Sequence, residues 1–186
     1  RAGLVDDLTG VFSHRYFQIR LAQEIFRAVR YKLPMNLMII DVDFFNQYAA
    51  NNGEENGNYV IKNIAEILKK NIRGSDVVVR NGADSFAIIL PNTVLSAALS
   101  LGNRFNAIIR NFPFVHGETQ PKKKITASVG LAFLDSQSPE EIILCCDKAL
   151  AVAIGKGGDR VELYLKDMEE ETGVIHSEAG FSKTEQ

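Results

Sequence analysis

The sequence predicts a single α/β domain in which helices cover a central sheet. Its 186 residues, 46% hydrophobic and 24% charged, are enough for one globular domain with a sizeable core. Segments with helical and strand-like periodicity follow one another along most of the chain. Together these observations predict an α/β sandwich with the order helix, strand, helix, β-hairpin, helix, strand, helix, strand.

The first elements are the most regular ones. Apolar residues at helical spacing predict a helix over residues 15–31, and the continuous apolar run 36–41 predicts a buried strand. The polar stretch 51–58, "NNGEENGN", is interpreted as a turn. A second helix is expected after it, through Val60 to Leu68.

A β-hairpin is predicted over residues 77–90, and Pro91 closes it. Two strand-like runs flank Asn81 and Gly82, and this pair favours a type I′ turn because both central residues of that turn need positive φ. Asp84 follows directly, where it is either ordinary turn chemistry or part of a functional site.

The second half of the chain continues the alternation. We expect a helix over 95–109, a strand over 125–134, a helix that begins at Pro139, and a last strand over 160–165. The polar, aperiodic residues that follow are predicted to form a flexible tail. This divides the chain into a domain, residues 1–165, and a C-terminal tail, residues 166–186. The abrupt start suggests a domain cut from a longer protein.

Charge and hydropathy exclude some classes of function. The net charge of −2 predicts no nucleic-acid partner and no membrane-binding surface. No apolar run approaches the roughly 18 residues of a membrane span. The adjacent Cys145 and Cys146 lie in a helical apolar pattern, which favours buried, reduced thiols and hence a cytoplasmic protein.

Acidic residues at the end of the first predicted strand are candidates for metal binding. Asp41 and Asp43 lie where ligand sites gather in proteins built from a sheet and helices. Asp41 would join Asp84 as a ligand of Mg²⁺ if the hairpin packs beside this strand. The alternative is that Asp41 and Asp43 only end the strand, since a lone Asp-x-Asp is an unspecific signal.

Several segments, taken in their order along the chain, narrow the interpretation. They are "DDLTGVFSHRYF", "DVDFF", "NNGEENGN", "RGSDVVVRNGADSF", "LP", "ITASVGLA" and "CDKAL". Over residues 4–164 this series resembles the GGDEF domain, the diguanylate cyclase module of bacterial signalling proteins, whose active members condense two GTP molecules to cyclic di-GMP. The resemblance implies a fold like adenylyl cyclase and polymerase palm domains, with a central, mostly antiparallel sheet of about five strands flanked by helices.

The family signature is altered in this chain. Gly-Gly-Asp-Glu-Phe aligns with Gly82, Ala83, Asp84, Ser85 and Phe86. Ala83 adds a methyl group where the family has a glycine, and Ser85 replaces a carboxylate. The resemblance assigns the metal-binding carboxylates to Asp41 and Asp84 and a third ligand to the carbonyl of Val42, which implies a vestigial Mg²⁺ site.

Most substrate contacts implied by the resemblance are also replaced. The guanine-binding Asn and Asp of the family align with Ala49 and Asn58. Three phosphate-binding cations align with Asn46, Ile154 and Gly158. Losing several charge-assisted contacts, each worth roughly 1.5–3 kcal/mol, predicts much weaker GTP binding.

Two cations lie close to the lost positions. Lys156 and Arg160 come two residues after them, and an offset of two residues turns a helical side chain away from the original direction. We therefore predict a degenerate GGDEF domain that is not an enzyme, has no catalytic residue and requires no cofactor.

A second ligand site is predicted to be intact. Arg73 and Asp76 form an Arg-x-x-Asp motif, which in many family members lies five residues before the signature and binds cyclic di-GMP as an inhibitor. Arg104 aligns with a supporting arginine. Guanidinium groups suit phosphate and guanine acceptors, and a carboxylate suits guanine N–H donors. The alternative is that Arg73 and Asp76 form an ordinary surface ion pair.

Three hypotheses follow for function. The leading one is a receptor or regulatory module that binds cyclic di-GMP through Arg73, Asp76 and Arg104 and couples it to fused or associated signalling domains, with a homodimer left open. The second is a residual metal-dependent enzyme that uses Asp41 and Asp84, as an altered cyclase or a weak nucleotide hydrolase. The third is a protein-interaction scaffold without a ligand. Arg80 is either a family arginine or a surface pair, and Asp6 and Thr9 are expected to hold the first helix.

Overall fold

The structure, a computed structural model, describes residues 3–166. Its elements are α1 (His14–Tyr31), β1 (Met35–Val42), α2 (Phe45–Asn52), α3 (Glu54–Lys70), β2 (Val77–Arg80), β3 (Ser85–Pro91), α4 (Leu95–Asn111), the 3₁₀ helix η1 (Gly117–Thr119), β4 (Ala127–Phe133), α5 (Pro139–Gly155) and β5 (Val161–Leu163). The five strands form one sheet in the order β2-β3-β1-β4-β5. Only β5 is parallel to its neighbour, so the predicted mostly antiparallel sheet is confirmed. The predicted tail lies outside the described residues, apart from Lys166.

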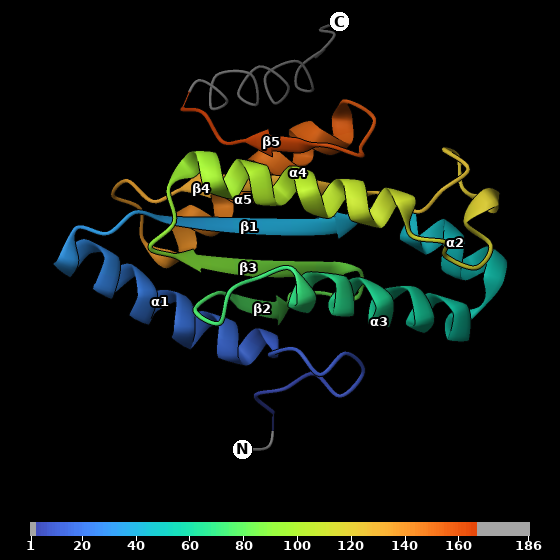
Figure 1. The fold of residues 1–186 in the computed structure, drawn as a ribbon, viewed down its shortest axis with the longest axis horizontal. Helices are drawn as coiled ribbons and strands as arrows, with labels where there is room; N and C mark the ends of the chain where they lie inside the picture. Colours follow the sequence, from blue (N-terminus) through green and yellow to red (C-terminus); the bar gives the residue numbers. More distant parts are fainter. Residues whose placement is uncertain (1–2, 167–186) are drawn as a thin grey trace, which may run out of the picture.

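Helices cover both faces of the sheet, with α4 in front of it and α5 behind it in Figure 1. Met38 and Ile40 of β1 pack into the core beneath α3 and α4. Leu37 and Ile39, which point the other way, pack into the core beneath α1 and α5. This burial on both sides explains why the run 36–41 contains no polar alternation.

The polar stretch 51–58 is helical, so its interpretation as a turn is wrong, and α2 is absent from the predicted element order. Within this stretch the helical conformation is interrupted only at Gly53, whose φ is 88° and which lies between α2 and α3. Asparagine side chains bond back along these helices, since Asn52 Nδ2 donates to the Tyr48 carbonyl at 3.0 Å and Asn56 Nδ2 to the Asn52 carbonyl at 2.7 Å. The buried ring of Tyr48 anchors α2 to the domain. Tertiary packing thus overrides a turn-like composition.

The β2–β3 hairpin is confirmed, but its predicted type I′ turn is wrong. Neither Asn81 nor Gly82 has a φ in the left-handed region. Both of their N–H groups donate to the Ser85 carbonyl, at 2.9 and 3.2 Å, in a longer connection between the strands. Arg80 Nε donates to the Gly82 carbonyl at 2.6 Å, and the same guanidinium donates to the Ala83 carbonyl. The arginine therefore stabilises a wider loop than an Asn-Gly pair alone would form.

The predicted burial of the two cysteines is also confirmed. Cys145 and Cys146 are buried and not joined in a disulfide, and Cys146 Sγ donates to the Leu37 carbonyl at 3.1 Å. Burial raises the pKa of the Cys146 thiol well above its usual value. Within residues 3–166, no helix combines the length and the apolar character needed to cross a membrane.

Candidate functional site

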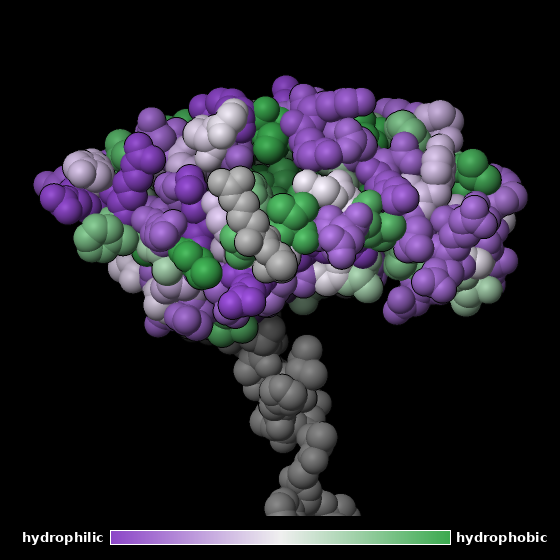
Figure 2. Space-filling view, turned by 90° about the horizontal axis from the view of Figure 1, so that it is seen from below, coloured by the Kyte–Doolittle hydropathy of each residue, from purple (hydrophilic) through white to green (hydrophobic). Residues whose placement is uncertain are grey.

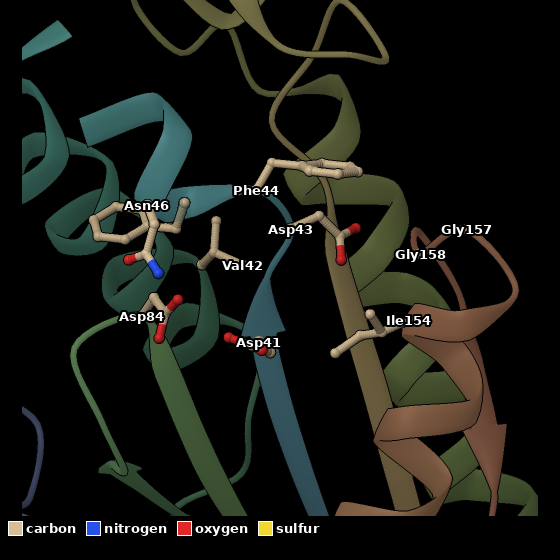
Figure 3. Close-up of a pocket in the computed structure, with 10 residues that line it drawn as sticks. Asp41, Val42, Asp43, Phe44, Asn46, Asp84, Ile154, Gly157 and Gly158 are labelled. Atoms are coloured by element: carbon tan, nitrogen blue, oxygen red, sulfur yellow. The ribbon is translucent and has the colours of Figure 1, made fainter. Parts of the chain in front are cut away.

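A pocket of about 210 Å³ lies at the carboxyl end of β1, and we call it the strand-end pocket (Figure 3). Its lining residues are Asp41, Val42, Asp43, Phe44, Phe45, Asn46, Asp84, Ile154, Gly157 and Gly158. Antiparallel pairing of β1 with β3 sets Asp41 opposite Ser85, and Val42 N donates to the Asp84 carbonyl at 3.0 Å. The hairpin therefore packs beside the first strand, as the metal-site hypothesis requires, and brings Asp41 and Asp84 to one pocket.

Asp41 is the electrostatically perturbed group of this pocket. Burial, followed by the charges of Asp84 and Asp43, raises the pKa of Asp41 from 3.8 to about 7. Its Oδ1 atom is buried and has no hydrogen-bond partner among the described residues. Carboxylate and carbonyl oxygens are hard donors, and a divalent cation would satisfy Oδ1 and offset the repulsion. Asp41, Asp84 and the Val42 carbonyl therefore fit a Mg²⁺ ion.

Asp43 has a different surrounding from Asp41 and Asp84. Its carboxylate accepts hydrogen bonds from Thr126 Oγ1 at 2.7 Å, Ser128 Oγ at 2.6 Å and the backbone N of Asp159 at 2.9 Å. Figure 3 shows it on the side of the pocket next to Gly157 and Gly158. Asp43 thus joins β1 to β4 and to the turn after α5, which supports the structural alternative for this residue alone.

Gly158 is the residue whose role the sequence does not reveal. The family resemblance aligns it with a phosphate-binding cation, but a Cβ atom at this position would lie 2.8 Å from both carboxylate oxygens of Asp43. Its φ of 73° is also unfavourable for any other residue. A glycine at position 158 thus lets the turn after α5 approach the Asp43 carboxylate closely, which allows the backbone N of Asp159 to donate to it.

The strand-end pocket contains no cationic side chain among its lining residues within the described part of the chain. Asn46, Ile154 and Gly158 line it, as their alignment implies. The nearby cations Lys156 and Arg160 do not line the pocket. Lys156 Nζ lies 3.1 Å and Arg160 Nη1 3.7 Å from Glu162 Oε1 on β5, and Arg160 Nε donates to the Gly158 carbonyl at 3.4 Å. The predicted loss of charge around this pocket is therefore seen in the structure.

The two positions aligned with guanine contacts lie to one side. Ala49 belongs to α2 and Asn58 to α3, and neither lines the strand-end pocket. Ala49 packs on α3, because a Cβ atom added at Gly57 of that helix would lie only 3.5 Å from the Cβ of Ala49. The α2–α3 junction thus packs tightly, with an alanine where the family has a hydrogen-bonding side chain.

A second pocket, which we call the arginine pocket, has a volume of about 400 Å³. Its lining residues are Asn71, Arg73, Asp76, Thr93, Ala97, Ser100, Leu101 and Arg104. Arg73 and Asp76 come from the loop between α3 and β2, whereas Arg104 comes from α4. The structure therefore brings together all three residues that the sequence assigns to a cyclic di-GMP site.

Asp76 is held in the arginine pocket with half of its carboxylate unused. Its side chain is 2% exposed, and Oδ2 accepts from the backbone N of Arg73 at 2.9 Å. Oδ1 is buried without a hydrogen-bond partner in the described part of the chain. A buried acceptor without a partner is costly, so this atom is suited to a donor from a ligand.

The two arginines are positioned by neutral partners. Arg73 Nη2 donates to Thr93 Oγ1 at 2.9 Å, and Arg104 Nη2 donates to the Asn71 carbonyl at 2.5 Å. Arg73 Nε lies 3.8 Å from Asp76 Oδ2, too far for a hydrogen bond, and its side chain is 62% exposed. The ion pair of the alternative interpretation exists but is long, and it leaves most guanidinium donors available.

One match to a known protein family covers most of the chain. The family model described as "Diguanylate cyclase, GGDEF domain" matches residues 3–160, which include every lining residue of both pockets. The chain belongs to the GGDEF family. The mostly antiparallel five-stranded sheet with flanking helices is accordingly the GGDEF fold.

Curated relatives share the GGDEF region with this chain. "Diguanylate cyclase DgcP" of Pseudomonas aeruginosa is 35% identical over 161 residues, which are 86% of this chain and 24% of that protein. "Response regulator PleD" of Caulobacter vibrioides is 28% identical over 160 residues, 85% of this chain and 35% of that protein. The chain thus spans about a third or less of these relatives.

Solved GGDEF structures have the same fold. The GGDEF domain of DgcB from Caulobacter crescentus, in complex with c-di-GMP, has a TM-score of 0.82 at 21% identity and covers 88% of this chain and 94% of that one. The diguanylate cyclase SiaD of Pseudomonas aeruginosa, in complex with its activator SiaC, has a TM-score of 0.79 at 28% identity, with 87% and 62% coverage.

These comparisons correct one prediction. The expectation that the chain is not an enzyme is wrong at the level of the family, because the matching family model is that of diguanylate cyclase and relatives such as DgcP are named diguanylate cyclases. The altered signature at Gly82–Phe86 led to that expectation, but substituted contacts in a GGDEF pocket do not by themselves establish lost activity.

Proposed function

We propose that this GGDEF domain binds cyclic di-GMP in the arginine pocket. The observation that carries the proposal is Asp76 Oδ1, a buried carboxylate oxygen without a partner in the described chain, in a pocket that Arg73 and Arg104 also line. A guanine edge supplies N–H donors for such an oxygen, and two guanidinium groups supply forked donors for phosphate and for guanine acceptors. One ligand with two guanines and two phosphates would use both features.

The proposal assigns a regulatory role to this pocket. Arg73 and Asp76 lie on the loop that leads into β2, and the hairpin β2–β3 carries Asp84 at the strand-end pocket. A ligand that stabilises the loop would act on the hairpin through this short connection. The similar DgcB domain is in complex with c-di-GMP, and SiaD is in complex with an activator. We extend both properties to this chain as part of the proposal, with fused or associated signalling domains as partners.

Titration calorimetry with cyclic di-GMP tests the proposal. We expect Arg73→Ala and Arg104→Ala each to weaken binding at least about tenfold, since each removes charge-assisted hydrogen bonds worth roughly 1.5–3 kcal/mol. Arg15→Ala, which removes an exposed arginine from α1, is the matched control and is expected to bind like the wild type. Absence of binding by the wild type, or equal binding by all variants, would contradict the proposal.

A second function is favoured by Asp41. We infer that Asp41, Asp84 and the Val42 carbonyl hold a divalent cation together with a nucleotide. The support is the raised pKa of Asp41 and its buried, unpartnered Oδ1. When bound, the cation would neutralise phosphate oxygens, which matters here because no Lys or Arg lines this pocket in the described chain. This inference keeps the chain within the metal-dependent chemistry of its family.

Melting temperatures with Mg²⁺, GTP, ATP and cyclic di-GMP test this second function. A ligand that binds only the folded state raises the melting temperature, so we expect a shift with Mg²⁺ plus nucleotide that Asp84→Asn abolishes. Chromatography of the same mixtures is expected to show a nucleotide product that is also lost in Asp84→Asn. No shift and no product would contradict the inference, and no response to any ligand would favour the scaffold hypothesis.

A further inference from the structure

Arg73 lines a further pocket besides the arginine pocket, and we call it the α1 pocket. It has a volume of about 170 Å³. Its lining residues are Glu24, Arg27, Ala28, Leu33, Arg73, Ser75, Pro91 and Asn92. The pocket is therefore built by α1, by the loop that leads into β2 and by the connection between β3 and α4.

The α1 pocket and the arginine pocket are neighbours. Arg73 lines both of them. Ser75 of the α1 pocket is followed directly in the chain by Asp76 of the arginine pocket, and Asn92 is followed in the same way by Thr93. The side chain of Arg73 therefore lies at the boundary between the two pockets.

Thr93 fixes Arg73 at this boundary. Thr93 is 3% exposed, and its Oγ1 atom accepts from Arg73 Nη2 at 2.9 Å. Thr93 is itself held from two sides, because its backbone N donates to the Pro34 carbonyl at 2.9 Å and its Oγ1 to the Pro91 carbonyl at 2.9 Å. The guanidinium of Arg73 is thus positioned by a buried residue, while its 62% exposed side chain stays accessible to a ligand.

The α1 pocket repeats the chemistry of the arginine pocket. The side chain of Glu24 is 5% exposed in the one, and that of Asp76 is 2% exposed in the other. Arg27 is an exposed arginine of the α1 pocket, as Arg104 is of the arginine pocket. Each pocket thus has one buried carboxylate and one arginine of its own, and the two pockets share Arg73.

Glu24 and the small volume restrict the kind of ligand that fits. Glu24 Oε1 lies 2.7 Å from Arg20 Nη2, an ion pair that offsets the charge of a buried carboxylate. A bare phosphate would meet this carboxylate beside the arginines, whereas a group with both N–H donors and a phosphate would use both. A complete small-molecule site usually has about 300–1,000 Å³, so a pocket of about 170 Å³ accommodates part of a larger ligand.

The surface on the α1 side of the molecule suits a polar ligand. In Figure 2, hydrophilic side chains predominate on the left, the side where α1 lies in Figure 1, and separate hydrophobic ones lie between them. A polar, charged ligand can therefore reach the α1 pocket without covering a large apolar patch.

We propose that the α1 pocket is a second compartment of the cyclic di-GMP site and binds one half of the ligand, while the arginine pocket binds the other half. The inference rests on the proposed function of the arginine pocket. Cyclic di-GMP has two identical halves, each with the N–H donors of a guanine and one phosphate. Glu24 and Arg27 offer one half the groups that Asp76 and Arg104 offer the other, and Arg73 donates to phosphate at the boundary.

Titration calorimetry with a mixed dinucleotide tests whether both halves are recognised. The probe is 3′,5′-linked cyclic GMP-AMP, which differs from cyclic di-GMP in one base. We expect it to bind at least about tenfold more weakly, because its adenine lacks the N1–H and 2-amino donors for one of the two carboxylates. If the arginine pocket alone recognised guanine, the mixed ligand would place its one guanine there and bind within about twofold of cyclic di-GMP. That result would overturn the second compartment and leave the proposed function intact.

Arg27→Ala tests the compartment from the side of the protein. We expect this variant to bind cyclic di-GMP at least about fivefold more weakly, since it loses charge-assisted hydrogen bonds. Arg30→Ala is the matched control, because Arg30 is an exposed arginine of the same helix that lines neither pocket. Binding that is lost in Arg73→Ala but unchanged in Arg27→Ala would contradict the second compartment alone. Absence of binding by the wild type would contradict the proposed function as well.

Glu24→Gln tests whether this carboxylate recognises the base. An amide offers a donor and an acceptor together, which suits adenine better than guanine. We therefore expect Glu24→Gln to narrow the difference in affinity between cyclic di-GMP and the mixed dinucleotide. Because Glu24 also pairs with Arg20, urea unfolding of the variant checks that it is folded. A difference that keeps its wild-type size in the folded variant would contradict the role of Glu24.

Discussion

Arg80 and Asp6 join the N-terminal turn to the loop that carries Asp84. Arg80 Nη1 lies 3.4 Å from Asp6 Oδ1, and the same oxygen accepts from the backbone N of Thr9 at 2.9 Å. Arg80 Nε donates to the Gly82 carbonyl at 2.6 Å, and the side chain is only 14% exposed. One side chain thus connects the start of the domain to the tip of the β2–β3 hairpin, and the predicted structural role of Asp6 and Thr9 includes this contact.

Replacing Arg80 is expected to loosen the hairpin loop. Arg80→Ala removes partners of two loop carbonyls and of Asp6, so we expect a loss of about 1–3 kcal/mol in the free energy of unfolding and faster amide exchange at Asn81 and Gly82. Asp6→Ala should cost less, because Arg80 keeps its loop carbonyls. Urea unfolding of both variants and of the double variant measures the coupling. Strictly additive costs would mean that Arg80 and Asp6 do not act together.

Gly158 and Gly157 provide a matched pair of substitutions. Both have φ in the left-handed region, at 73° and 98°, so an alanine at either position costs roughly 1–2 kcal/mol of backbone energy. Only at Gly158 would the new Cβ meet Asp43, at 2.8 Å, whereas nothing lies within 4 Å of it at Gly157. We therefore expect Gly158→Ala to be the more destabilising in urea unfolding. Equal costs would show that contact with Asp43 does not require the glycine.

The stability of the metal-free domain is expected to depend on pH through Asp41. Its pKa is raised from 3.8 to about 7, so between these values the folded state retains a proton that the unfolded state has released. The free energy of unfolding therefore falls as pH rises through this window. With a chelator present, Asp41→Asn should flatten that slope. Asp84→Asn should reduce it only in part, because burial is the largest cause of the shift. An unchanged slope in Asp41→Asn would contradict this assignment.

The local pattern of apolar residues was sufficient to predict strands and helices where burial alone determines the conformation. The run 36–41 is a strand because both faces of β1 are buried, and helices α1, α4 and α5 follow the periodicity of their apolar residues. Pattern failed at residues 51–58, where composition indicates a turn. There the buried Tyr48, whose hydroxyl donates to the Val115 carbonyl at 2.6 Å, holds α2 in place over a separation that no local pattern reports.

The same division between sequence and tertiary structure applies to both candidate sites. Which residue types are present, such as Asp41, Asp84, Arg73, Asp76 and Arg104, and their spacing in family motifs, were determined by the sequence.

Only the tertiary structure decided how those residues meet. Pairing of β1 with β3 brings Asp41 to Asp84, while packing of α4 brings Arg104 to Arg73. Pairing of β1 with β4 fills the acceptors of Asp43 with hydrogen bonds from Thr126 and Ser128, which sets Asp43 apart from the pair. The physical reason is that burial and an unsatisfied oxygen are properties of what surrounds an atom, and those surroundings come from segments distant in the chain.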